Sequence, residues 1–124
     1  MAVPLLKQGD YLIVSLPPGL IDRDWLKLGE DLVEGVGKFR SKGAIIDITA
    51  LDLIDSFAAR TLRAIAQACK LRGTETVVVG MQPEVAFAMV QLGLTLGSVM
   101  TALDLEEGLA LLKRQAKEKG TRGR

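Results

Sequence analysis

Two hydrophobic patterns alternate along the chain: short continuous apolar runs, and apolar positions spaced three or four residues apart. Short runs bounded by Gly, Pro or polar residues predict strands, and a run that is apolar throughout predicts a strand buried on both faces. The predicted strands are residues 5–8, 11–16, 44–48, 76–79 and 98–102. Gly9-Asp10, between the first two, is a pair typical of tight turns.

The three- and four-residue spacing predicts helices at residues 22–39, 56–72, 83–92 and 104–116. Asp22 is predicted to cap the first helix, and Pro83 suits the first position of the third. Asp104 with Glu107 resembles a capping box at the start of the last. The positions predicted to face the core are Trp25, Leu28, Leu32, Val36, Phe39, Ala58, Leu62, Ile65, Ala66, Cys69, Leu105, Leu109, Leu112 and Ala116. The positions predicted to face solvent on the first helix are Asp24, Lys27, Asp31, Glu34 and Lys38.

The order of these elements predicts an α/β fold with one mostly parallel central sheet of about five strands and four helices. A length of 124 residues suits a single domain. We expect residues 1–116 to form this domain. Residues 117–124 are basic and have nothing to bury, so we expect a disordered tail.

Composition narrows the function classes further. The chain has no histidine, which excludes triads that use imidazole, and Cys69 is its only cysteine, which excludes an internal disulfide or a CxxC pair. A net charge of +1 disfavours binding to nucleic acid or to an anionic membrane surface. The chain contains no apolar run long enough to span a membrane and begins without a secretion-signal pattern, so we expect a cytoplasmic protein.

The loop after the third predicted strand attracts attention because functional loops of such sheets gather at the carboxyl ends of the strands. This loop covers residues 49–55, and Asp55 is predicted to cap the helix that begins at Ser56. A hydroxyl at the first helical position lies near unpaired backbone N–H groups, a setting that tolerates a phosphate. An ordinary serine that merely follows a cap fits the same pattern.

The carboxylates of the same region offer a second kind of chemistry. Asp47, Asp52 and Asp55 could form a carboxylate cluster for Mg²⁺, although the first long strand ends in Ser15-Leu16 without further acidic residues. The chain has no Gly-rich phosphate cradle, so nucleotide binding through the known motifs is not expected.

Surface patterns leave two alternatives open for the third helix. Residues 83–92 are apolar around most of the helix, so either flanking segments cover it or part of it stays exposed for a protein partner. Arg60, Arg63 and Lys70 are expected on the outer face of the second helix. Cys69 is expected to be a small core residue.

Three segments resemble the STAS domain, which sulphate transporters and anti-sigma-factor antagonists share. They are residues 45–59 (IIDITALDLIDSFAA), 80–86 (GMQPEVA) and 101–109 (TALDLEEGL), and the resemblance covers about residues 5–115. The pair Asp55-Ser56 in the loop is its most specific feature. Within the family, the chain looks most like the small single-domain antagonists of the stressosome.

The resemblance implies a phosphorylatable, non-catalytic protein without a cofactor or metal. In the family, a switch kinase phosphorylates the serine or threonine at this point, which corresponds to Ser56. We expect a partner to contact this region. The residues expected to bind the partner are Asp52, Ile54, Asp55, Phe57 and Arg60. Paralogues of the RsbR type carry a second acceptor threonine before the first long helix, where this chain has Leu20.

The implied partners are a switch serine/threonine kinase of the RsbT type and paralogous STAS proteins of the RsbR type, held in homo- and hetero-oligomers. The implied function is a stressosome scaffold and antagonist that sequesters the kinase and releases it when Ser56 is phosphorylated, in the general stress response. A simpler one-to-one anti-anti-sigma factor is the first alternative. A small α/β ligand-binding or enzymatic domain that uses the carboxylates near Ser56 is the second.

Overall fold

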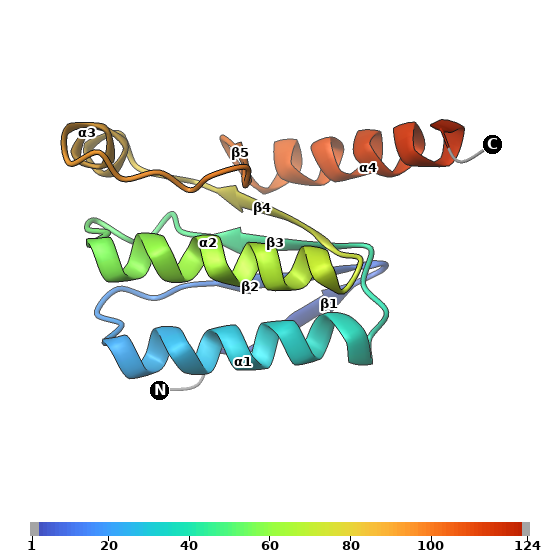
Figure 1. The fold of residues 1–124 in the computed structure, drawn as a ribbon, viewed down its shortest axis with the longest axis horizontal. Coiled ribbons are helices and arrows are strands. Elements are labelled where there is room, and N and C mark those ends of the chain that lie inside the picture. The colour runs from blue at the N-terminus through green and yellow to red at the C-terminus, as the bar shows by residue number, and fades with distance from the viewer. Residues whose placement is uncertain (1–2, 123–124) are drawn as a thin grey trace.

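The computed structural model describes residues 3–122 and, within them, the side chains of residues 3–118. Strands and helices alternate in the predicted order (Figure 1). The elements are β1 (Leu6–Gln8), β2 (Tyr11–Ser15), α1 (Asp22–Lys38), β3 (Gly43–Asp47), α2 (Ser56–Leu71), β4 (Glu75–Val79), α3 (Pro83–Gln91), β5 (Met100–Ala102) and α4 (Leu105–Arg122).

The five strands form one sheet in the order β1-β2-β3-β4-β5. β1 pairs with β2 antiparallel, and the other three pairings are parallel. The tight turn between β1 and β2 contains Gly9 at a φ of +59°, a conformation that glycine adopts without strain. The predicted α/β fold, with a mostly parallel sheet of five strands and four helices, is therefore confirmed.

The sheet is covered on both faces, and Figure 1 shows α1 and α2 side by side over one of them. Alternate residues of β3 point to opposite faces. Ile46 packs with α1 and α2 in the larger hydrophobic cluster, whereas Ile45 packs with Leu112 of α4 in the smaller one. β3 is thus buried on both sides, as its uninterrupted apolar run predicts.

The start of α1 differs from the prediction. Ile21, not Asp22, is the N-cap residue, and Asp22 is the first residue of the helix. The carboxylate of Asp24 accepts a hydrogen bond from the backbone N–H of Ile21 at 3.1 Å. Because it folds back over the helix start, Asp24 is only 9% exposed instead of facing solvent.

The ends of α1 and α4 supply two further corrections. Phe39 was expected in the core, but it follows the last residue of α1 and is 40% exposed, with the Lys38 ammonium 5.6 Å from its ring centre. Ala116 was also expected in the core and is exposed. α4 continues through residues 117–122, for which the sequence predicts a disordered tail; that disorder stays a prediction, and residues 123–124 lie outside the described part of the chain.

Candidate functional site

The loop of residues 48–55 rises from the centre of the sheet at the carboxyl ends of the parallel strands, on the left of Figure 1. Its first residues are still tied to neighbouring strands. The backbone N–H of Ile48 donates to the carbonyl of Val79 at 2.9 Å, and that of Leu16 donates to the carbonyl of Asp47 at 2.9 Å. The base of the loop is therefore fixed to both strands that flank β3.

A network of hydrogen bonds around Thr49 holds the next turn of the loop. Asp47 Oδ1 accepts hydrogen bonds from the backbone N–H and the hydroxyl of Thr49, at 2.9 and 2.6 Å. The amide of Gln82, just before α3, donates to the carbonyl of Thr49 at 2.8 Å. Gly80 passes so close that a Cβ there would overlap Thr49 Oγ1. These contacts join the loop to the segment that leads into α3.

Two apolar side chains fix the rest of the loop to the hydrophobic core. Leu51 and Ile54 are 4% and 3% exposed and belong to the larger core cluster. The expectation that Ile54 contacts a partner is thus corrected, because its side chain is enclosed by the protein's own core. Leu53, between them, points outward and is 73% exposed.

Ser56 is the first residue of α2, and its side chain is exposed. The predicted cap is confirmed, because Asp55 Oδ1 accepts a hydrogen bond from the backbone N–H of Ala58 at 2.8 Å. In the described part of the chain, the backbone N–H groups of Ser56 and Phe57 have no acceptor, as is usual in the first turn of a helix. Solvent or a docked protein can reach the Ser56 hydroxyl, and the helix start favours added negative charge there.

The other residues predicted to bind a partner fall into two groups. Asp52, Asp55 and Arg60 are exposed around Ser56, whereas Phe57 is half-buried against the core. Exposure makes contact of the first group with a partner possible, and that role stays a prediction.

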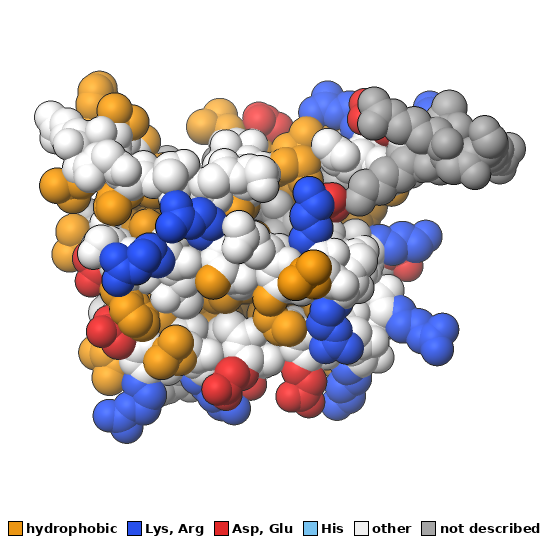
Figure 2. Space-filling view, in the orientation of Figure 1, with side chains coloured by type: hydrophobic (Ala, Val, Ile, Leu, Met, Phe, Trp, Pro, Cys, Tyr) orange, Lys and Arg blue, Asp and Glu red, His pale blue; other side chains and the backbone are white. Residues whose placement is uncertain are grey.

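α3, which follows Gln82, has apolar side chains on two of its sides. Val85 and Met89 are buried in the core, but Phe87 and Val90 on the opposite side of α3 are 72% and 78% exposed. Figure 2 shows hydrophobic side chains gathered at this end of the molecule. Part of α3 is therefore exposed, and a protein partner on this surface stays a prediction. Sequence reasoning missed the exposed Leu53, because one leucine in a polar loop gives no periodic signal.

The described residues contain no group of three acidic or cysteine side chains placed to hold a metal ion. In the proposed carboxylate cluster, Asp47 is already bonded to Thr49 and Asp55 caps α2. The magnesium alternative therefore lacks a geometric basis in this part of the chain.

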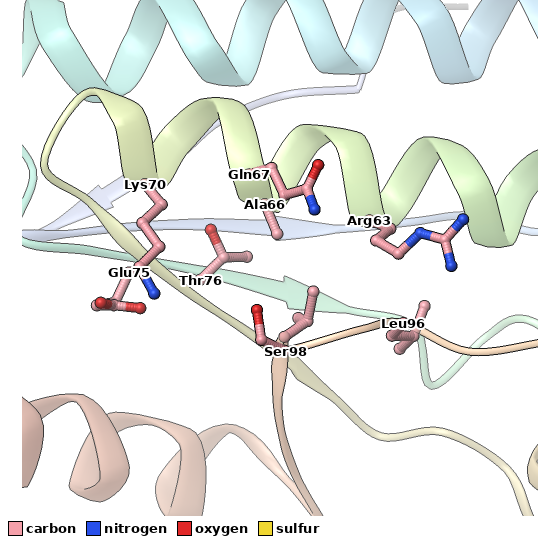
Figure 3. Close-up of a pocket in the computed structure, with 9 residues that line it drawn as sticks. Arg63, Ala66, Gln67, Lys70, Glu75, Thr76, Leu96 and Ser98 are labelled. Atoms are coloured by element: carbon pink, nitrogen blue, oxygen red, sulfur yellow. The ribbon is translucent and has the colours of Figure 1, made fainter.

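A small cavity lies along α2, about two to four turns beyond Ser56 (Figure 3). Arg63 and Lys70 line it from α2, opposite Thr76 and Ser98, and its volume is about 30 Å³. That volume suits about one water molecule. Cys69 lies close by in the core, where burial raises the pKa of its thiol. The prediction that Cys69 is a buried core residue is confirmed.

Comparison with known proteins assigns the class. A profile of the STAS domain matches residues 6–107. A structure of RsbS from Moorella thermoacetica, in a variant with one serine replaced by glutamate, is 36% identical, with a TM-score of 0.80 over 93% of this chain and 97% of that chain. This chain belongs to the STAS domain family.

Further similarities point to stressosome proteins. A structure of the stressosome, described as a signal integration and transduction hub, contains a chain that is 34% identical, with a TM-score of 0.74 over 91% of this chain and 98% of that one. The RsbT co-antagonist protein RsbRA of Bacillus subtilis (strain 168) is 32% identical over 110 residues, which are 88% of this chain. This chain spans only 40% of the length of RsbRA. The similar proteins are regulatory antagonists and stressosome components. No helix among the described residues is long and apolar enough to cross a membrane.

Proposed function

We propose that this chain is a non-catalytic stressosome scaffold and antagonist that holds a switch serine/threonine kinase of the RsbT type and releases it when Ser56 is phosphorylated. The observation that carries the proposal is the exposed Ser56 hydroxyl at the first residue of α2, in a chain that is similar to RsbS over nearly its whole length. The name of RsbRA, an RsbT co-antagonist, supports the choice of kinase.

The surroundings of Ser56 supply the physical reason for release. Exposed Leu53 lies in the same loop, so a partner that covers Ser56 also buries an apolar side chain. Phosphorylation adds about 1.5 to 2 negative charges beside the carboxylates of Asp52 and Asp55. Burying that charge in an apolar contact carries a desolvation cost, so the partner leaves. The fold stays intact because the start of α2 accommodates the phosphate.

The proposal includes a cytoplasmic assembly with paralogous STAS proteins of the RsbR type. Similarity to a chain of the stressosome supports this assembly. Sizing the purified protein with and without an RsbR-type paralogue tests it. A large mixed complex is expected, whereas a one-to-one complex with a kinase and no paralogue assembly would favour the simpler anti-anti-sigma role.

The acceptor itself is tested by incubating the protein with an RsbT-type kinase and ATP and mapping the phosphate by mass spectrometry. We expect one phosphate on Ser56, its loss in Ser56→Ala, and normal modification in the matched control Ser98→Ala, which removes another exposed serine. Phosphate on Ser15, Ser41 or Ser98 in place of Ser56 would contradict the proposal.

A further inference from the structure

A groove opens directly beside the loop that carries Ser56. It lies between the turn after β2 and the loop before α2, and its volume is about 240 Å³. Pro18 and Leu20 line one side, Leu51 lines the other, and Trp25 of α1 also lines the groove. The lining thus combines apolar side chains, one of them aromatic, with a comparable share of polar surface.

Two carboxylates also line this groove. Asp52 and Asp55 are both exposed, and neither forms an ion pair with a cation among the described residues. Asp55 uses Oδ1 to cap α2, which leaves its second oxygen available, and Asp52 makes no hydrogen bond within the described part of the chain. A groove that combines apolar side chains with two unpaired carboxylates is complementary to an apolar stem with a cationic end.

The size of the groove indicates which kind of occupant fits. Pockets for drug-sized ligands and cofactors have volumes of about 300 to 1,000 Å³. A groove of 240 Å³ lies below that range and suits one long side chain. Arginine combines an apolar stem with a planar cation that stacks on aromatic rings and binds carboxylates.

We propose that this groove receives a basic side chain, preferably arginine, from the kinase that acts on Ser56. The inference rests on the proposed function and names a recognition element of the same site. A kinase must bring the negatively charged γ-phosphate of ATP next to Ser56, and Asp52 and Asp55 repel it. A basic side chain of the kinase, seated between them, offsets this repulsion during transfer.

The same charges account for release after transfer. The phosphate on Ser56 brings the local charge to about −3.5 to −4 when Asp52 and Asp55 are included. One cation of the partner compensates only one of these negative charges. The rest would stay uncompensated in a contact that also buries Leu53. The cationic contact therefore assists docking and transfer without holding the phosphorylated product.

The experiment compares two Asp-to-Asn variants of the full chain, by titration calorimetry with an RsbT-type kinase at several salt concentrations. Asp52→Asn removes one charge from the groove and keeps the size of the side chain. Asp10→Asn is the matched control, because Asp10 lies in the turn before β2, at the opposite end of the parallel strands, and its carboxylate forms an exposed 3.7 Å ion pair with Lys42. We expect Asp52→Asn to weaken binding about tenfold and to reduce the salt dependence, because the negative charge that pairs with the cation of the kinase is lost while an oxygen acceptor stays in place. Asp10→Asn should change neither.

A second measurement uses Trp25, the only tryptophan of the chain, as a reporter inside the groove. A short arginine-containing peptide is titrated against the protein while tryptophan emission is followed, and the same peptide with citrulline serves as the neutral control. We expect the arginine peptide to change the emission at lower concentration than the citrulline peptide, and this preference to disappear in Asp52→Asn.

The outcomes separate this inference from the proposed function. If the kinase binds both variants and the unaltered chain with equal affinity and salt dependence, the groove does not take a cation and the inference is wrong, while kinase capture stands. Equal responses to the arginine and citrulline peptides would also overturn it. If the kinase binds neither the unaltered chain nor the two variants, the proposed capture of a kinase is itself wrong.

Discussion

The cap at the start of α2 is the contact that holds Ser56 in place, and its contribution to stability can be measured. Asp55→Ala removes the acceptor of the 2.8 Å hydrogen bond from the Ala58 N–H. Loss of such a cap costs about 1 kcal/mol, within a range of about 0.5 to 2 kcal/mol. For a chain of this length, that corresponds to a fall in Tm of about 4 °C, or in the urea midpoint of about 0.5 M.

Two control variants isolate the cap. Asp55→Asn keeps an oxygen acceptor at the N-cap and should retain most of the stability. Asp52→Ala removes an exposed carboxylate three residues earlier and should change the free energy of unfolding by less than about 0.5 kcal/mol. The assay is urea unfolding followed by far-ultraviolet circular dichroism. Equal stability of Asp55→Ala and Asp52→Ala would refute the role of the cap.

Two further predictions concern the contact between Gly80 and Thr49 and the buried thiol of Cys69. Gly80→Ala should lower the free energy of unfolding by more than about 1 to 2 kcal/mol, because Gly80 has a φ of +80° and its new Cβ would also displace Thr49. The control is Gly9→Ala, at a φ of +59° with nothing within 4 Å, which should show the cost of the backbone strain alone. Equal losses in urea unfolding would contradict the contact. Burial raises the pKa of the Cys69 thiol above its ordinary value of 9.0, so the unfolded chain loses this proton at lower pH than the folded protein. The thiol should therefore leave the free energy of unfolding unchanged below about pH 8.5 and lower it as the pH rises further. In Cys69→Ala, the urea midpoint should fall less over this alkaline range than in the unaltered protein.

Much of the fold could be predicted because its signals are local. The apolar run of β3 and the helical spacing in α2 each identify an element, and the alternation of elements identifies the sheet. The cap at Asp55 was also predictable, because Asp is a preferred N-cap residue, although the same signal placed the cap of α1 one residue too late, at Asp22. These features depend on residues that are close in the sequence.

The features that the sequence did not predict depend on contacts between distant segments. Gln82 bonds the carbonyl of Thr49 across 33 positions, and nothing in either segment indicates that pair. The exposure of Phe87 depends on which side of α3 meets the core. Asp24 is an exception, because its contact is local: its carboxylate accepts a hydrogen bond from the N–H of the N-cap residue Ile21, and the spacing of polar positions does not indicate this bond.

The candidate site divides in the same way. The position of Ser56 followed from the order of strand, loop and helix, and its exposure agrees with that prediction. Ile54 was assigned to the partner surface because it lies in the same loop, but its side chain belongs to the core. The groove beside Trp25 could not be predicted, because its walls come from two loops, α1 and α2.

In the proposed switch, the charge on Ser56 decides whether the kinase is held. The most direct measurement is the dissociation constant between an RsbT-type kinase and this protein, before and after stoichiometric phosphorylation, together with Ser56→Asp and Ser56→Ala. We predict that phosphorylation and Ser56→Asp weaken binding at least tenfold, whereas Ser56→Ala binds like the unmodified protein and keeps the kinase bound in the presence of ATP. Equal affinity of the phosphorylated and unmodified forms would contradict the account.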